Sequence, residues 1–156
     1  MPKPLWAPWR LEYIEHADEQ RRCIFCEPEE ELVVHRVAHA VVLLNRFPYT
    51  SGHMLVAPLR HVADFGELTD EEVLAAHRLA STAIGALAQA YRAQGYNLGW
   101  NLGRIAGAGI VDHVHLHVVP RWAGDTNFMP VLADVKVLPE ALVETARRLR
   151  EVWPRV

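Results

Sequence analysis

Short apolar runs separated by turn residues fill the first third of the chain. They predict three strands, over residues 32–36, 41–45 and 53–57. The turn between the second and third strands falls at 48–52, and Pro58 is expected to stop the third strand because proline cannot donate to a sheet. Tight spacing of this kind indicates hairpin-linked, antiparallel strands.

A helical period replaces the strand pattern after Thr69. Thr69 and Glu72 have the spacing of a capping box, in which the threonine caps the helix and the glutamate reaches back. Apolar residues then recur at helical spacing, which predicts one long amphipathic helix ending near Gly95. These apolar residues are Val73, Leu74, Ala76, Leu79, Ala80, Ala83, Ile84 and Leu87.

The remainder of the chain predicts two further strands and a second helix. A fourth strand is expected over 96–102, and a fifth over 111–119, ended by Pro120. A loop rich in glycine and alanine, 103–109, separates them. The last helix is expected from near Pro139 to Trp153. Hairpin-linked strands around one long helix indicate an α+β fold with a five-stranded antiparallel sheet.

Length and composition favour a single globular domain. The 156 residues, of which 51% are hydrophobic, suit one compact unit over 1–156. We divide it into an N-terminal arm (1–22), a core (23–130) and a C-terminal extension that carries the last helix (131–156). Three prolines and two tryptophans within 1–12 indicate an extended arm that packs against the core.

Charge and hydropathy exclude several function classes. A formal net charge of −3 gives no electrostatic reason to expect binding to nucleic acid or to an anionic membrane, although it allows a local anion pocket. No apolar run approaches the roughly 20 residues that span a bilayer. The first residues lack the apolar segment of a signal peptide, so we expect a cytoplasmic protein.

Three alternating histidines, His113, His115 and His117, are the clearest chemical signal. On a strand they share one face, about 6.7 Å apart, while the apolar residues between them enter the core. Neutral imidazole is a nucleophile, and its protonated form is an acid near pH 7, so such a row suits a phosphoanhydride. Two other readings stay open: half-buried structural histidines, or three ligands of a catalytic zinc.

Cys23 and Cys26, the two cysteines of the chain, are separated by two residues. One such pair cannot be a disulfide framework, so it indicates metal binding or redox chemistry. Zinc sites use this spacing and take four nitrogen or sulfur ligands. A redox pair and two inert buried thiols are the alternatives.

The histidine row and its surroundings resemble a known family. Residues 113–119 resemble the signature of the histidine-triad (HIT) superfamily, in which three histidines alternate with apolar residues. Residues 44–60 are similar to the second and third strands of its fragile-histidine-triad branch. Residues 5–10, 106–110 and 120–128 are similar to bacterial diadenosine tetraphosphate phosphorylases. The resemblance implies a HIT-like fold over nearly the whole chain.

The resemblance also implies catalytic roles for particular residues. His115 would be the nucleophile that forms a covalent nucleotidyl-histidine, and His117 would contact the reacting phosphate and assist at the leaving oxygen. His53, with His113, would complete the histidine set. Asn45 would lie near the ribose and Asn101 would hold an α-phosphate oxygen. Both asparagines also have structural alternatives, Asn45 as a turn residue and Asn101 as a partner of a backbone group.

The chain departs from hydrolase relatives just before the histidine row. Many of them carry a polar Gln-Ser or Gln-Thr pair where this chain has Gly109 and Ile110. This departure favours a phosphorylase, in which inorganic phosphate takes the nucleotide from His115. Backbone amides of the glycine loop, including Gly107 and Gly109, together with Arg104, could hold that phosphate.

Relatives with the cysteine pair complete a zinc site with two histidines, which here are His61 and His113. A closed set of Cys23, Cys26, His61 and His113 would leave no open coordination position, so the zinc would be structural. No catalytic metal is then expected. The metal would staple the N-terminal arm to the sheet.

These observations predict an enzyme that cleaves an adenine-type nucleotide or a dinucleoside polyphosphate at the α-phosphate. By family resemblance we expect a homodimer. Two other classes stay open: a zinc-dependent hydrolase that uses the histidine row as ligands, and a non-catalytic nucleotide sensor that binds without turnover.

Overall fold

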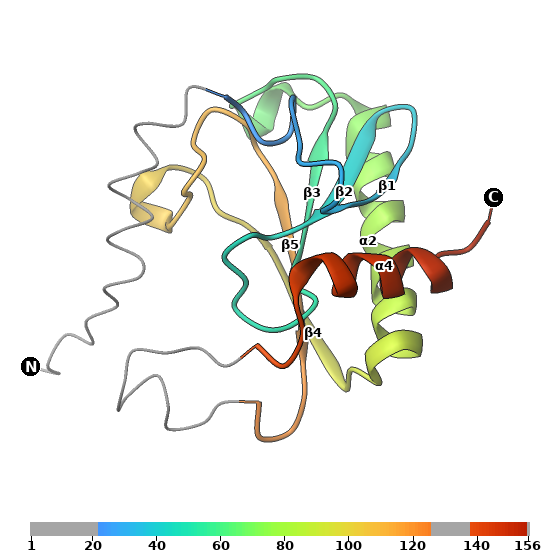
Figure 1. Cartoon of the computed structure of the whole chain (residues 1–156). Helices are drawn as coiled ribbons and strands as arrows, with labels where there is room; N and C mark the ends of the chain where they lie inside the picture. Colours follow the sequence, from blue (N-terminus) through green and yellow to red (C-terminus); the bar gives the residue numbers. More distant parts are fainter. Residues whose placement is uncertain (1–21, 126–137, 156) are drawn as a thin grey trace, which may run out of the picture.

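The computed structural model of the chain describes residues 22–125 and 138–155 (Figure 1). The predicted N-terminal arm (1–22), apart from Arg22, and the part of the phosphorylase-like segment from Thr126 onward lie outside the described residues.

One antiparallel sheet of five strands forms the centre of the fold, in the order β1-β2-β3-β5-β4. Its strands are β1 (Val33–Arg36), β2 (Ala40–Leu44), β3 (Met54–Pro58), β4 (Gly95–Trp100) and β5 (Leu116–Arg121). Each pair of neighbours is antiparallel. The α+β class and the five-stranded sheet are therefore confirmed.

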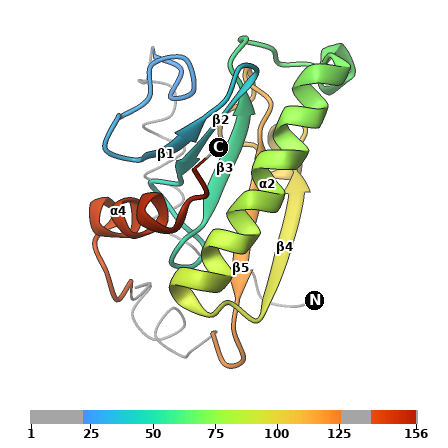
Figure 2. The ribbon, with the colours of Figure 1, turned by 90° about the vertical axis from the view of Figure 1, so that its right-hand side faces the viewer.

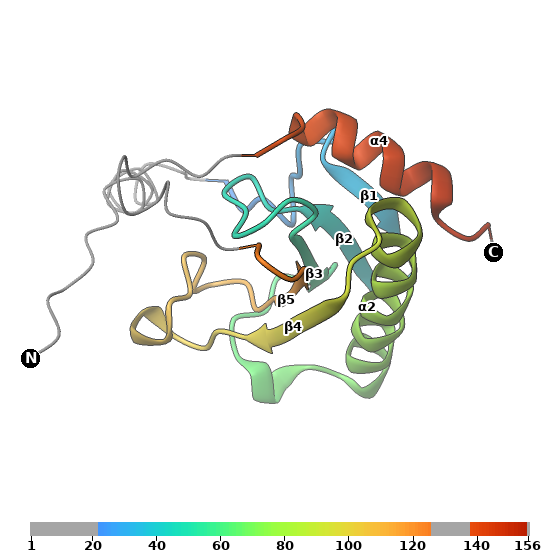
Figure 3. The same ribbon diagram turned by 90° about the horizontal axis from the view of Figure 1, so that it is seen from below.

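Two helices cover one face of this sheet (Figures 2 and 3). The long helix α2 (Asp70–Tyr91) packs on β2, β3 and β5, and the shorter α4 (Leu142–Val152) packs on α2 and β1. Two 3-10 turns, η1 (Phe65–Glu67) and η2 (Arg104–Ala106), lie in the loops. Among the described residues, no helix has the length and apolar character that crossing a membrane requires.

The capping box of α2 forms as predicted. The Thr69 hydroxyl accepts from the Glu72 amide at 3.3 Å, and the Glu72 carboxylate accepts from the Thr69 amide at 2.9 Å. The helix ends earlier than predicted, at Tyr91 rather than near Gly95, because Arg92 takes the left-handed conformation that terminates it (φ 52°). Gly95 begins β4 instead.

The last helix also starts later than predicted. Ala141 is extended (φ −68°, ψ 143°) and serves as the N-cap, so α4 begins at Leu142 and not near Pro139. The Glu140 carboxylate accepts from the hydroxyls of Tyr91 at 2.5 Å and Thr145 at 2.9 Å. These bonds tie the start of α4 to the end of α2.

The fifth strand differs most from its predicted range of 111–119. It begins at Leu116, because the chain just before it is held by another partner: the Val114 amide donates to the Val62 carbonyl at 2.8 Å. It also continues through Pro120 to Arg121. β3 pairs with β5 only as far as Val118, so no amide is required of Pro120 on that side.

Apolar residues gather on both faces of the sheet. The larger cluster lies under the helices and includes Leu116 and Val118 of β5. Since side chains alternate along a strand, His117 between them faces the other side. The smaller cluster occupies that other side, and its members are Phe25, Val33, Val41, Leu43, Leu55 and Ala57. The histidine chemistry therefore lies on the face opposite the helices.

Candidate active site and metal centre

His115 has one ring nitrogen anchored and the other available. Its side chain is buried, and Nδ1 lies 2.9 Å from the carbonyl oxygen of His113. Because a carbonyl only accepts, Nδ1 carries the proton and Nε2 carries the lone pair. Among the described residues, every fully buried side-chain nitrogen has a hydrogen-bond partner. Nε2 of His115 has no such partner, so it is not fully buried and reaches the surface of the site. An unprotonated, accessible Nε2 is what a nucleophile needs.

His53 and His117 form a chain of hydrogen bonds beside His115. The Tyr49 amide donates to Nδ1 of His53 at 3.1 Å, which leaves the His53 proton on Nε2. That nitrogen lies 2.9 Å from Nδ1 of His117 and donates to it. Nε2 of His117 therefore carries a proton, so the Asn101 amide nitrogen 3.5 Å away does not donate to it and stays available for another acceptor. His117 is set to donate a hydrogen bond into the site.

Burial keeps the side chains of His115 and His117 uncharged. It lowers the pKa of His115 below its usual value, and burial together with the neighbouring His115 lowers the pKa of His117 to about 4. Both rings are thus neutral at pH 7. The acid expected near pH 7 is therefore replaced by a neutral Nε2–H donor on His117.

His113 belongs to a different group from its two neighbours in the row. Its Nε2 lies 2.9 Å from the Pro58 carbonyl and donates to it, so Nδ1 carries the lone pair. Nδ1 faces sulfur, at 3.1 Å from Sγ of Cys23 and 3.7 Å from Sγ of Cys26. Both nitrogens are engaged away from His115, so His113 lies with the two cysteines and not with His115 and His117.

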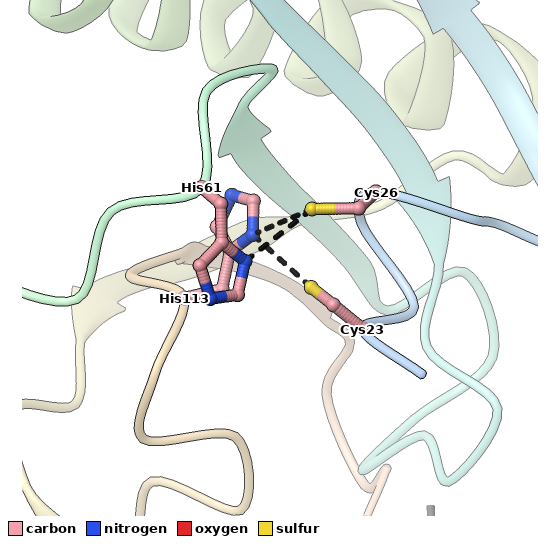
Figure 4. A group of neighbouring side chains, drawn as sticks. All are labelled: Cys23, Cys26, His61 and His113. Carbon is pink, nitrogen blue, oxygen red and sulfur yellow. Dashed lines mark hydrogen bonds between the residues drawn. The ribbon is translucent and has the colours of Figure 1, made fainter. Parts of the chain in front are cut away.

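The four predicted zinc ligands come together from three separate segments (Figure 4). The ligand atoms of Cys23, Cys26, His61 and His113 all lie within 4.8 Å of one another. The sulfur–nitrogen distances are 3.1, 3.3 and 3.7 Å. In a tetrahedral zinc site a ligand sulfur and a ligand nitrogen lie about 3.6 Å apart, which falls within this range. Within the described ranges this is the one such group of metal-ligating side chains.

A second partner orients one histidine of this group, and a carboxylate lies near the other. Pro58 fixes the ring of His113, as above, and the Asp112 carboxylate lies 3.8 Å from Nε2 of His61. Outer partners of this kind present the opposite nitrogen to a metal. The donor set and its support therefore fit zinc.

The thiols do not resemble a redox pair. Burial and then the neighbouring Cys23 raise the pKa of Cys26 to about 11. A reactive cysteine instead has a lowered pKa, because the thiolate is the reacting species. Both cysteines are free and they face the two histidines, as metal ligands would.

Asn45 has the structural bond that its alternative predicted and also a contact in the site. Its side-chain oxygen accepts from the Phe47 amide at 2.9 Å, which makes it a turn residue at the end of β2. Its amide nitrogen lies 3.4 Å from Nδ1 of His53. Asn45 is thus next to the histidine chain, where a ribose contact stays a prediction.

The predicted phosphate loop is partly closed on itself. Gly107 adopts φ 92° after η2, and the amides of Ala106, Gly107 and Ala108 donate to carbonyls of Gly103 and Arg104. These three amides are therefore not offered to an anion. Any cradle has to use other groups of the segment, such as the half-buried Gly109.

Sequence reasoning missed two aromatic neighbours of the histidines. The ring of Tyr49 stacks parallel to that of His117, with centroids 6.0 Å apart, and Phe25 packs against both His113 and His115. Phe25 stands between the two cysteines in the sequence, which was the available signal. The contact of Tyr49 with His117 joins two distant segments and left no local pattern.

Comparison with known proteins finds relatives over most of the chain. The chain is 37% identical over 164 residues to an AP-4-A phosphorylase of Mycobacterium tuberculosis, covering 97% of this chain and 84% of that protein. It is 35% identical over 108 residues to an adenosine 5'-monophosphoramidase of Schizosaccharomyces pombe, covering 64% and 74%. Both relatives are named for reactions of nucleotides.

A solved structure is also similar. A zinc-bound histidine triad family protein from Mycobacterium smegmatis matches with a TM-score of 0.67 and 28% identity, covering 83% of this chain and 91% of that one. The family model that describes the HIT domain matches residues 28–124, which include all the histidines of the site but neither cysteine. The chain belongs to the HIT domain family.

Proposed function

We propose that this protein cleaves dinucleoside polyphosphates, or similar adenine-type nucleotides, at the α-phosphate through a covalent nucleotidyl-histidine on His115. The observation that carries the proposal is the state of the His115 ring: Nδ1–H is bound to a carbonyl at 2.9 Å and Nε2 is unprotonated and accessible. The 37% identity to an AP-4-A phosphorylase supports the choice of substrate class.

In the first step Nε2 of His115 attacks the α-phosphorus, and the bond from phosphorus to the bridging oxygen breaks. The positive charge that develops on the imidazole is stabilised through Nδ1–H by the His113 carbonyl. Nε2–H of His117 donates to the departing oxygen, and His53 holds the tautomer that makes this donation available. Asn101 lies 3.5 Å from the same nitrogen, where its amide can hold a phosphate oxygen.

In the second step inorganic phosphate or water attacks the nucleotidyl-histidine and frees His115. We favour phosphate, because Gly109 and Ile110 replace the polar pair of hydrolase relatives and because a relative is a phosphorylase. Nucleotide release measured with and without added phosphate distinguishes the acceptors. Faster release with phosphate, with the phosphate incorporated in the product, is expected. Equal rates would mean that water is the acceptor.

The proposed metal is a structural zinc held by Cys23, Cys26, His61 and His113. When bound, it would cross-link three segments and supply no reaction chemistry, since four protein ligands close its shell. A zinc hydrolase built on the histidine row is less compatible with the geometry. Nδ1 of His115 and both nitrogens of His113 are engaged elsewhere, so the three rings do not converge.

A second copy of the chain is expected to pair with this one. β4 lies at the edge of the sheet, and Leu98 on it is 45% exposed. An exposed apolar edge strand favours pairing with another chain. Sedimentation analysis tests the proposed homodimer: a particle of one chain's mass at micromolar concentration would contradict it.

Replacement of His115 tests the proposed reaction. His115→Ala should abolish turnover while nucleotide binding persists, since only the nucleophile is lost. His115→Gly should recover measurable turnover when free imidazole is added, because imidazole can occupy the vacated position. Normal turnover in His115→Ala would overturn the proposal, and tight binding without turnover in the unchanged protein would identify a sensor.

A further inference from the structure

The turn that carries the two cysteines also carries a buried aromatic residue with no part in the proposed reaction. The amides of Cys26 and Glu27 both donate to the Cys23 carbonyl, at 3.1 and 2.9 Å, which closes a compact turn. Its thiols face the ligand histidines (Figure 4), and Cys26 is exposed. Phe25, by contrast, is only 2% exposed and joins the smaller apolar cluster.

The Phe25 ring touches both kinds of histidine. Its centroid lies 5.0 Å from that of His115, tilted by 35°, and 5.0 Å from that of His113, tilted by 54°. The His115 ring also contacts His117, with centroids 5.0 Å apart. The nucleophile is thus in contact with two rings and is anchored by one hydrogen bond from Nδ1.

One hydrogen bond by itself does not fix the direction of Nε2, because the imidazole can tilt about the donor–acceptor line. Packing against rigid neighbours removes that freedom. The Phe25 side chain has no hydrogen-bond donor or acceptor, so it acts on His115 only by steric packing. Misplacing a reacting group by about 1 Å can cost on the order of a hundredfold in rate.

We propose that Phe25 is a positioning residue for His115, through which the Cys23–Cys26 turn holds the nucleophile in its reactive orientation. The inference rests on the proposed function of His115. The group of Cys23, Cys26, His61 and His113 then does more than cross-link the chain. The same turn that supplies two of the proposed zinc ligands also supplies the ring that packs against the reacting imidazole.

The test replaces Phe25 and compares chemistry with binding. Phe25→Ala should lower the single-turnover rate of adduct formation by at least about tenfold, with the dissociation constant for nucleotide changed by less than about threefold. Phe25→Leu, which restores part of the volume, should recover part of the rate. Metal content should stay equal to that of the unchanged protein, because no ligand is altered.

Leu43→Ala is the matched control. Leu43 belongs to the same buried cluster but lies on β2, separated from β5 by β3. Its truncation should destabilise the fold and leave the adduct rate within about twofold. The ring-proton resonances of His115 provide a readout without turnover: they should shift in Phe25→Ala and Phe25→Leu, which lose the aromatic ring, and not in Leu43→Ala.

Several results would overturn the inference. They are an unchanged adduct rate in Phe25→Ala, an equal loss of rate in Leu43→Ala, loss of metal from Phe25→Ala, and unshifted His115 resonances. If Phe25→Ala does not fold, Phe25→Leu carries the same comparisons. Absence of any adduct on the unchanged protein would contradict the proposed function instead.

Discussion

At the scale of single residues, three neighbouring histidines behave differently because their second nitrogens have different partners. Nδ1 of His115 binds a carbonyl, Nδ1 of His117 accepts from His53, and Nε2 of His113 binds the Pro58 carbonyl. A partner on one nitrogen decides what the other can do. The same side chain can therefore be a nucleophile, a donor or a metal ligand within five residues.

The pKa of His117 makes a prediction about stability. Burial and the neighbouring His115 lower this pKa to about 4, whereas the unfolded histidine titrates near about 6.5. Between about pH 6.5 and about pH 4, the unfolded state binds a proton at this histidine that the folded state does not bind. The free energy of unfolding should therefore decrease from about pH 6.5 to about pH 4.

Urea unfolding at a series of pH values measures this effect. His117→Asn removes the titrating group, so the variant should show a shallower loss of stability across the same window. The difference between the two proteins isolates His117 from other titrating groups. Parallel curves for the two proteins would show that His117 is not buried in its neutral form.

At the scale of elements, the sequence predicts which side chains share a face better than it predicts where strands end. Leu116 and Val118 lie in the cluster under the helices, whereas Phe25 of the other cluster contacts His113 and His115, as the predicted separation of faces requires. Yet only His117 lies in a strand, because the chain before Leu116 bonds to Val62 in a distant loop. Such a bond depends on tertiary structure, and no local pattern records it.

Gly52 fixes the entry to β3 and thereby the position of His53. It adopts φ 81°, and a Cβ built on it would lie 2.7 Å from a side-chain carbon of Leu87 on α2. Gly52→Ala should therefore cost about 1–2 kcal/mol for the left-handed backbone, with an added cost for moving Leu87. Thermal and urea unfolding measure the loss.

Gly85 provides the control for this substitution. It lies inside α2 with nothing within 4 Å of a built Cβ. Gly85→Ala should stabilise the protein by about 0.5–1 kcal/mol, because alanine favours the helix. The opposite signs at the two glycines are the expected result, and a neutral Gly52→Ala would contradict the tight approach of Leu87.

At the scale of the whole molecule, the proposed zinc ligands come from parts of the chain that are far apart in sequence. Cys23 and Cys26 lie before β1, His61 follows β3, and His113 precedes β5. The residue types and the cysteine spacing were readable from the sequence. Resemblance to a family was needed to choose the two histidine ligands out of nine histidines. Which distant residues the fold brings together is not visible in any local sequence pattern.

Metal removal should lower the thermal stability of the protein, and its immediate effect on the reaction rate should be smaller. Protein purified without chelator should contain one zinc per chain, and chelation should lower Tm because a cross-link between three segments is lost. Cys26→Ser should lower Tm in the same way and abolish the effect of chelator. Metal analysis and calorimetry measure this, and an identical Tm with and without zinc would contradict a structural site.

The central claim is that Nε2 of His115 forms a covalent bond to the α-phosphorus of a nucleotide. Brief incubation with a diadenosine polyphosphate, followed by rapid quenching and peptide mass spectrometry, tests it most directly. The account predicts an adenylyl group on the peptide that contains His115, assigned to that residue and absent from His115→Ala. An adduct on another residue, or turnover through the first cleavage with no adduct at any time point, would contradict it.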